Sequence, residues 1–198
     1  MSEILSTIVS QLKGPALESL ASSVGTDESS TQTAIATALP LLMKALANNT
    51  SDGKGASALA KALDNDHDGS VLSDLGGLLS SDSSTSTGQS ILKHVLGSKS
   101  SVIADAIGKS AGLDSSNAGV LIAKLAPLVM GYLGKAKREE NLDSDGLSAL
   151  LKNEAQTVEK KGPKEMSMLT SLLDSDNDGN VSDDLVDLGS SLLKSFLK

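Results

Sequence analysis

The stretch 35–46, IATALPLLMKAL, returns 87 positions later as IAKLAPLVMGYL at 122–133. Both stretches carry a proline at the same place, Pro40 and Pro127, inside a run of aliphatic residues. Because proline occupies a special backbone conformation, leucine richness alone does not explain this coincidence. The repeat predicts that the chain is a tandem duplication.

The match continues on both sides of this stretch and sets the expected domain organisation. Gly25 and Asp27 align with Gly112 and Asp114, and the second copy carries extra polar residues at 153–165. The Ser/Thr-rich residues between the copies are typical of a flexible linker. We expect the two copies to pack on each other. The predicted units are repeat one at 1–80, a linker at 81–88, and repeat two at 89–198 with the insertion at 153–165.

The apolar spacing predicts helices, and the expected fold class is all-α. Apolar residues between positions 4 and 12 recur at helical intervals, and Gly14-Pro15 ends that run. Asp27 and Asp114 are natural N-caps for the long helices that follow. The prolines inside those helices predict a kink or a break. Neither copy shows sustained period-two alternation, so we expect a small helical unit repeated twice.

Each copy ends in the same acidic pattern, Asp-x-Asp-x-Asp-Gly, followed by a small polar residue and Val. EF-hand loops bind Ca²⁺ with oxygens from alternate positions, and a glycine at position 6 permits the sharp turn. The loops at 64–74 and 174–184 therefore predict two EF-hand-like Ca²⁺ sites, each between two helices. The predicted ligands are Asp64, Asp66, Asp68, the Ser70 carbonyl and Asp74, and Asp174, Asp176, Asp178, the Asn180 carbonyl and Asp184.

The loops also depart from the EF-hand pattern. Position 12, normally a bidentate Glu, is Leu75 or Leu185, and the last acid comes one residue early. Mg²⁺ is disfavoured because it requires near-octahedral geometry, and Zn²⁺ is disfavoured because the chain has no Cys. The alternative interpretation is a pair of acidic turns without an ion.

Charge is concentrated in these loops. They hold nine acidic residues, and without them the formal net charge of −8 would be +1. A third acidic stretch, 141–146, lacks the third carboxylate, and we interpret it as the N-cap region of a helix.

Composition and motifs exclude several other functions. Without Cys there is no disulfide scaffold and no thiol catalysis. We identify no catalytic residue, since His67 lies in an acidic loop and His94 is interpreted as a partly buried or surface residue. The basic cluster of Lys135, Lys137 and Arg138 is followed by two glutamates, which indicates a solvated helix end. The apolar run 120–133 is too short to span a bilayer and predicts a buried helix.

The chain resembles the bacterial family of unknown function that includes YidB-like proteins, numbered 937 among such families. The resemblance depends on the segments 38–43 and 125–130, on 91–97 and 134–139, and on the two acidic loops. It implies small, compact, all-helical domains with no assigned activity.

The leading hypothesis is a noncatalytic Ca²⁺-binding helical protein in which the ion stabilises the fold or the assembly. The alternative is a self-assembling surface or filament subunit with calcium-stiffened repeats, whose partner is another copy as a homo-oligomer. A helical nucleic-acid-binding module ranks below both, and no small-molecule substrate is identified. No signal peptide is visible, which gives a cytoplasmic location by default, with an extracellular or cell-surface location as the alternative. The C-terminal residues carry an apolar stripe, for which we favour intramolecular packing over a subunit contact: Leu185, Leu188, Leu192, Leu193, Phe196 and Leu197.

Overall fold

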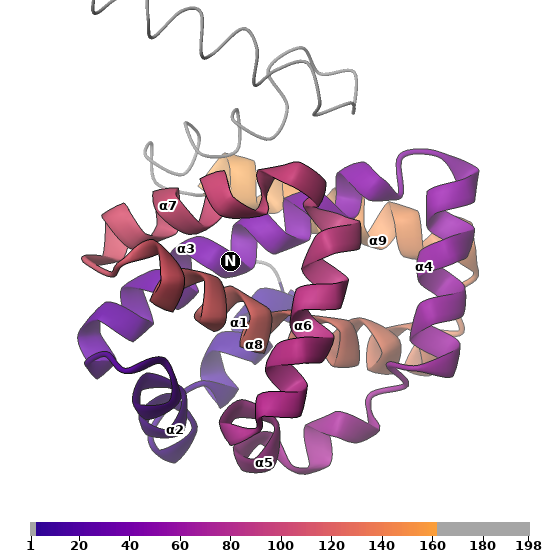
Figure 1. Ribbon diagram of the computed structural model, residues 1–198. Coiled ribbons are helices and arrows are strands. Elements are labelled where there is room, and N and C mark those ends of the chain that lie inside the picture. Colours follow the sequence, from indigo (N-terminus) through magenta and orange to yellow (C-terminus); the bar gives the residue numbers. More distant parts are fainter. Residues whose placement is uncertain (1–2, 162–198) are drawn as a thin grey trace, which may run out of the picture.

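The computed structural model describes residues 3–161, and all regular structure in this range is helical (Figure 1). This confirms the all-α prediction for the described part of the chain. The second acidic loop and the C-terminal apolar stripe lie outside the described residues. The elements are α1 Glu3–Gln11, α2 Pro15–Val24, α3 Glu28–Asn49, α4 Gly53–Asn65, the 3₁₀ turn η1 Ser70–Ser73, α5 Leu75–Ser80, α6 Asp82–Val95, the 3₁₀ turn η2 Gly97–Lys99, α7 Ser100–Ala111, α8 Ser115–Glu139 and α9 Ser144–Lys161.

Helix α8 is the centre of the fold. The helices α6 and α7 make the most extensive contacts with it, and α1, α2, α3 and α4 also pack against it. Residues 121–131 of α8 are all buried, as expected for the apolar run at 120–133. Within residues 3–161, α8 is the helix long and apolar enough to cross a membrane, but 78% of its most apolar window is buried in the protein. Its apolar composition is therefore explained by its position in the core.

The helix boundaries follow the predicted local signals. The Asp27 and Asp114 carboxylates accept hydrogen bonds from the N–H groups of Ser30 and Asn117, at 2.9 and 2.8 Å. Both aspartates are thus N-caps, as predicted, each satisfying a backbone donor that the first turn leaves unpaired. Gly25 ends α2 in the left-handed region with φ of 76°, where glycine has no steric cost.

The two internal prolines do not break their helices. Helix α3 is continuous from residue 28 to 49 through Pro40, and α8 is continuous from 115 to 139 through Pro127. A proline costs a helix interior about 3 kcal/mol. Burial of one large aliphatic side chain contributes about 1.5–3 kcal/mol, and several are buried on either side of each proline. Of the predicted kink or break, the break does not occur, because tertiary packing outweighs the local penalty.

Residues 81–88 do not form the flexible linker that their composition suggested. Ser81 caps α6, which begins at Asp82, and both Ser84 and Gly88 are buried. A Cβ at residue 88 would overlap the Ala123 carbonyl of α8, so Gly88 lets the two helices approach closely. Small residues that favour a linker in isolation here serve close helix packing. The predicted insertion also begins as helix, because α9 continues to Lys161.

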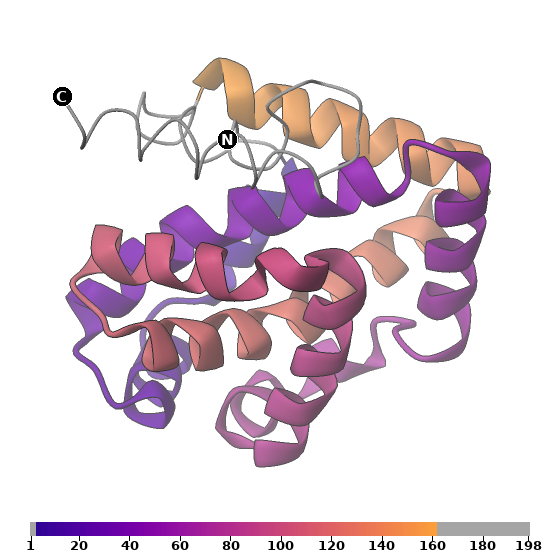
Figure 2. The same ribbon diagram turned by 45° about the horizontal axis from the view of Figure 1, so that its top comes forward.

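Elements from the first and second halves of the described chain are interleaved. Helix α4 packs against α8 and α9, and α9 lies along α3 (Figure 2). Because α4 crosses to α8, the acidic loop that follows α4 is brought to the C-terminal end of α8.

Candidate functional site: an acidic loop beside an apolar pocket

The first acidic loop rests on the last turns of α8. Val71, the valine that ends the acidic pattern, is partly buried and packs against the core. A Cβ at residue 131 would lie 2.7 Å from Val71 Cγ1, and one at residue 134 would overlap the His67 carbonyl. Gly131 and Gly134 therefore give the loop the space that it needs against α8.

The loop makes its sharp turn at the predicted glycine. Gly69 has φ of 91°, a conformation that residues with a Cβ rarely adopt. Beside it, the Asp68 carboxylate accepts a hydrogen bond of 2.9 Å from the Ser70 N–H. Hydrogen bonding by Ser70, through its side chain and then its N–H, lowers the pKa of Asp68, and the Arg138 charge contributes a smaller lowering.

Two carboxylates of the loop are paired with cations of α8. Lys137 Nζ lies 2.6 Å from Asp64 Oδ1, and an Arg138 guanidinium nitrogen lies 3.4 Å from Asp68 Oδ2. These two cations belong to the cluster that was interpreted as a solvated helix end, and their pairing was not predicted. The available signal was charge, because the chain has one short basic cluster and two strongly acidic loops.

The remaining predicted ligands of this loop have other positions. Asp66 is the C-cap residue of α4, while Asp74 caps α5 by accepting a hydrogen bond of 2.9 Å from the Gly77 N–H. The Ser70 carbonyl accepts a hydrogen bond from the Ser73 hydroxyl. Between residues 3 and 161, no three acidic or histidine side chains gather in a position to hold a metal ion. The structure thus pairs Asp64 and Asp68 with cations at the end of α8, whereas Asp66 and Asp74 lie at helix ends.

The other two acidic stretches are the second loop at 174–184 and the residues 141–146. The predicted ligands Asp174, Asp176, Asp178, Asn180 and Asp184 lie outside the described residues. The stretch 141–146 is a helix N-cap region, as predicted, because the Asp143 carboxylate accepts a hydrogen bond of 2.8 Å from the Gly146 N–H.

A pocket of about 690 Å³ lies between α4 and α6, next to the acidic loop. Sequence reasoning missed it, because its two walls are far apart in the chain. Both histidines of the protein line it, and burial lowers the pKa of His67. The lining residues are Leu46, Asn49, Gly55, Ala58, Leu59, Ala62, Asp66, His67, Thr87, Ser90, Ile91, His94, Val95 and Met130.

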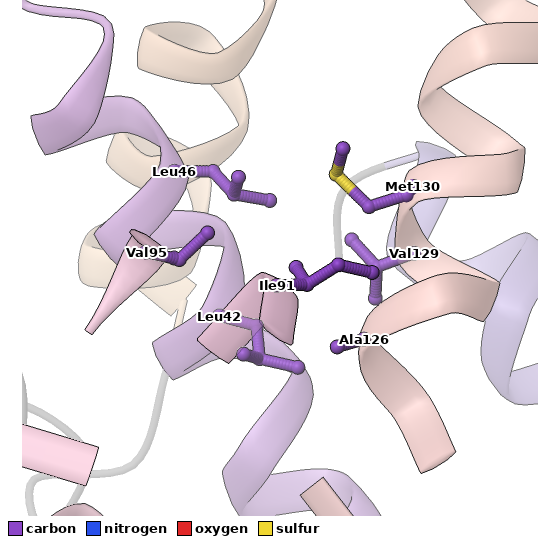
Figure 3. Close-up of a pocket in the computed structure, with 7 residues that line it drawn as sticks. All are labelled: Leu42, Leu46, Ile91, Val95, Ala126, Val129 and Met130. Atoms are coloured by element: carbon purple, nitrogen blue, oxygen red, sulfur yellow. The ribbon is translucent and has the colours of Figure 1, made fainter. Parts of the chain in front are cut away.

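The floor of this pocket continues into a small apolar recess between α3, α6 and α8 (Figure 3). Four residues line both spaces, namely Leu46, Ile91, Val95 and Met130. The recess measures about 10 Å³ and its lining is apolar, so it offers a water molecule no hydrogen-bond partner. The pocket therefore combines an apolar floor with a polar rim.

Searches of curated proteins and of solved structures each found no match. A family model described as "Bacterial protein of unknown function (DUF937)" matches residues 6–136, about two thirds of the chain. The matched region extends from α1 through most of α8, and includes the first acidic loop and the pocket. The chain therefore belongs to this bacterial family of unknown function, as the sequence resemblance predicted.

Proposed function

We propose that this is a noncatalytic helical protein whose acidic loops bind Ca²⁺. The bound ion would hold each loop, and the segment that follows it, against the helical core. The observation that carries the proposal is the convergence of Asp64 and Asp68 on neighbouring cations at the end of α8. The carboxylates of an acidic loop are stabilised by positive charge beside them. Here Lys137 and Arg138 supply it, and a divalent cation is the stronger alternative.

Binding of Ca²⁺ to this loop requires a local rearrangement. The ion needs six to eight oxygens at about 2.3–2.6 Å, so Asp64 and Asp68 must leave their ion pairs and turn toward Asp66. The turn at Gly69 and the Asx hydrogen bond at Asp68 already have the form that such a loop needs. Because two protein cations compete for the ligands, we expect weak affinity in this loop.

We also infer that the chain is a tandem duplication and that the second loop binds Ca²⁺ in the same way. The matched N-caps Asp27 and Asp114, and the matched prolines within long helices, support the duplication. At the positions that align with Gly131 and Gly134, α3 has Lys44 and Ala47. These two side chains leave less space on α3 than the glycines leave on α8.

A Ca²⁺ titration of the full chain, followed by thermal melting, tests the proposal. Ca²⁺ that binds only the folded state adds about 2.7 kcal/mol per site at a hundredfold excess over Kd. We expect chelator to lower the melting temperature, Ca²⁺ to restore it, and an equal concentration of Mg²⁺ to restore it poorly. Lys137→Met should tighten binding to the first loop, because it removes the competing cation.

The control variants separate ion binding from general acidity. The double variant Asp66→Ala, Asp176→Ala removes a central ligand from each loop while both glycine turns remain. Asp145→Ala removes an exposed carboxylate from the stretch that is only an N-cap region. If the double variant responds to Ca²⁺ as the wild type does, the loops are acidic turns and the proposal is wrong.

A further inference from the structure

The polar rim of the pocket between α4 and α6 presents hydrogen-bond acceptors. The Asn49 side-chain amide donates to the carbonyls of Ala45 and Val95, at 2.8 and 2.7 Å, so its free group is the carbonyl oxygen. The Ser90 hydroxyl donates to the Ser86 carbonyl and retains only acceptor capacity. In both residues the donors are used within the protein.

The histidine of α6 follows the same pattern. His94 Nδ1 lies 2.8 Å from the Ser90 carbonyl, and a carbonyl can only accept, so Nδ1 carries the proton. In the neutral ring, Nε2 is therefore an acceptor. Asp66 adds a carboxylate, whose charge also acts on the neighbouring His67 of the pocket lining. The rim thus combines one negative charge with several neutral acceptors, and His67 and Thr87 also line it.

The pocket volume of about 690 Å³ is in the range of small-molecule sites, and its floor is aliphatic. A molecule that fits this floor needs an apolar chain. To bind the rim as well, its head needs several N–H donors and a positive charge. We propose that this pocket binds a small amphipathic organic amine, with its ammonium group at Asp66 and His94 and its alkyl chain on the floor at Leu59, Ile91 and Met130. This inference goes beyond the Ca²⁺ proposal and does not depend on it. The two share Asp66, so Ca²⁺ bound in the loop would compete with the ammonium group.

Charge argues against the opposite ligand class. An anionic head would face the Asp66 carboxylate in a protein of net charge −8, and the rim would leave it few donors. A neutral alcohol could use the acceptors but would gain nothing from the carboxylate. The proposal therefore predicts an order of affinity, in which the ammonium binds best and the carboxylate worst.

The test is an NMR titration of the full-length protein with chelator present, so that Asp66 is free of metal. The chain has two histidines and both line the pocket, so their ring signals report this site directly. The probes are butyl-, hexyl- and octylammonium, with octan-1-ol and octanoate as head-group controls, all below their micelle concentrations. We expect affinity to rise about fourfold per methylene, and octylammonium to bind tighter than octanol and octanoate.

Two pairs of variants locate the binding. Asp66→Asn should weaken octylammonium binding about three- to fivefold at low salt and leave octanol unchanged, while Glu18→Gln on α2 should change neither. Ala58→Phe, at an exposed position of the lining, should fill the pocket and abolish binding of every probe. Ser101→Phe, at an exposed position of α7, is its control. Thermal melting of each variant confirms that it is folded.

Two results would overturn the proposal. Equal affinity for octylammonium, octanol and octanoate would show an apolar recess with no preference for an ammonium group. Unchanged histidine signals at millimolar octylammonium would show that another part of the chain, or a second copy, covers the pocket.

Discussion

The C-terminal ends of α3 and α8 started from the same sequence pattern and have different structures around them. Both helices begin at an Asp N-cap and continue through a proline. With the 87-residue shift, the last residue of α3, Asn49, aligns with Ala136, but α8 continues to Glu139. The extra turn contains Lys137 and Arg138, which hold the first acidic loop.

Two glycines account for the rest of the difference. Gly131 and Gly134 let the loop lie directly on α8, whereas α3 has Lys44 and Ala47 at the aligned positions. The residues that α3 and α8 share therefore specify the helices and where they begin. The residues that differ decide what can pack on each helix.

The largest expected effect comes from exchanging the small residues at aligned positions. In Gly134→Ala, the new Cβ overlaps the His67 carbonyl, and overpacking of this kind costs about 1–3 kcal/mol. Ala47→Gly, the reverse change in α3, should cost only about 1 kcal/mol through helix propensity. Urea unfolding of both variants measures the difference, and equal losses would mean that the close approach at Gly134 contributes nothing to stability.

The N-caps Asp27 and Asp114 should contribute equally to stability, because both accept the same kind of hydrogen bond at the start of a long helix. Asp27→Ala and Asp114→Ala each remove one capping hydrogen bond and should each cost about 1 kcal/mol. Asp→Asn at the same positions retains the acceptor and should recover most of the loss. Thermal melting is sufficient, and a loss in only one helix would contradict the equivalence of the caps.

The ion pair at the end of α8 should have a smaller effect. The Lys137 side chain is 14% exposed and that of Asp64 is 52% exposed, so solvent screens the pair. We expect a coupling of about 0.5–1 kcal/mol in a double-mutant cycle of Lys137→Met and Asp64→Asn without Ca²⁺. The coupling should decrease in 1 M salt, and a coupling that is independent of salt would argue against an electrostatic origin.

In the middle of α8 lies a buried lysine, where α3 has a threonine at the aligned position. Its substitution should have the smallest effect on stability. Lys124 of α8 aligns with Thr37 of α3, and its Nζ donates to the Ser81 carbonyl at 3.2 Å. Burial lowers the pKa of Lys124, while the charge of Asp82 opposes this change. Between the lowered pKa and the unfolded value near 10.5, the unfolded chain binds more protons, so stability should rise with pH.

Lys124→Met keeps the buried aliphatic stem and removes the titrating group. Its stability should lack the rise that the wild type shows as the pH approaches 10.5, as measured by urea unfolding between pH 7 and pH 10. Identical pH profiles for the two proteins would show that the Lys124 charge is fully compensated in the folded state.

The sequence by itself determined the helical fold and the local turns. Caps, glycine turns and apolar spacing act within a few residues, so Asp27, Asp114, Gly25 and Gly69 could be assigned from their neighbours alone. The same locality explains why the buried helix at 120–133 and the N-cap region at 141–146 were predicted correctly.

Only the tertiary structure decided what depends on residues distant in the chain. Packing against α8 makes residues 81–88 a helix, continues both long helices through proline, and brings Lys137 and Arg138 to the acidic loop. It also brings His67 and His94 to one pocket between α4 and α6. The physical reason is that burial and pairing energies depend on which surfaces meet, and the spacing of residues along one segment does not contain that information.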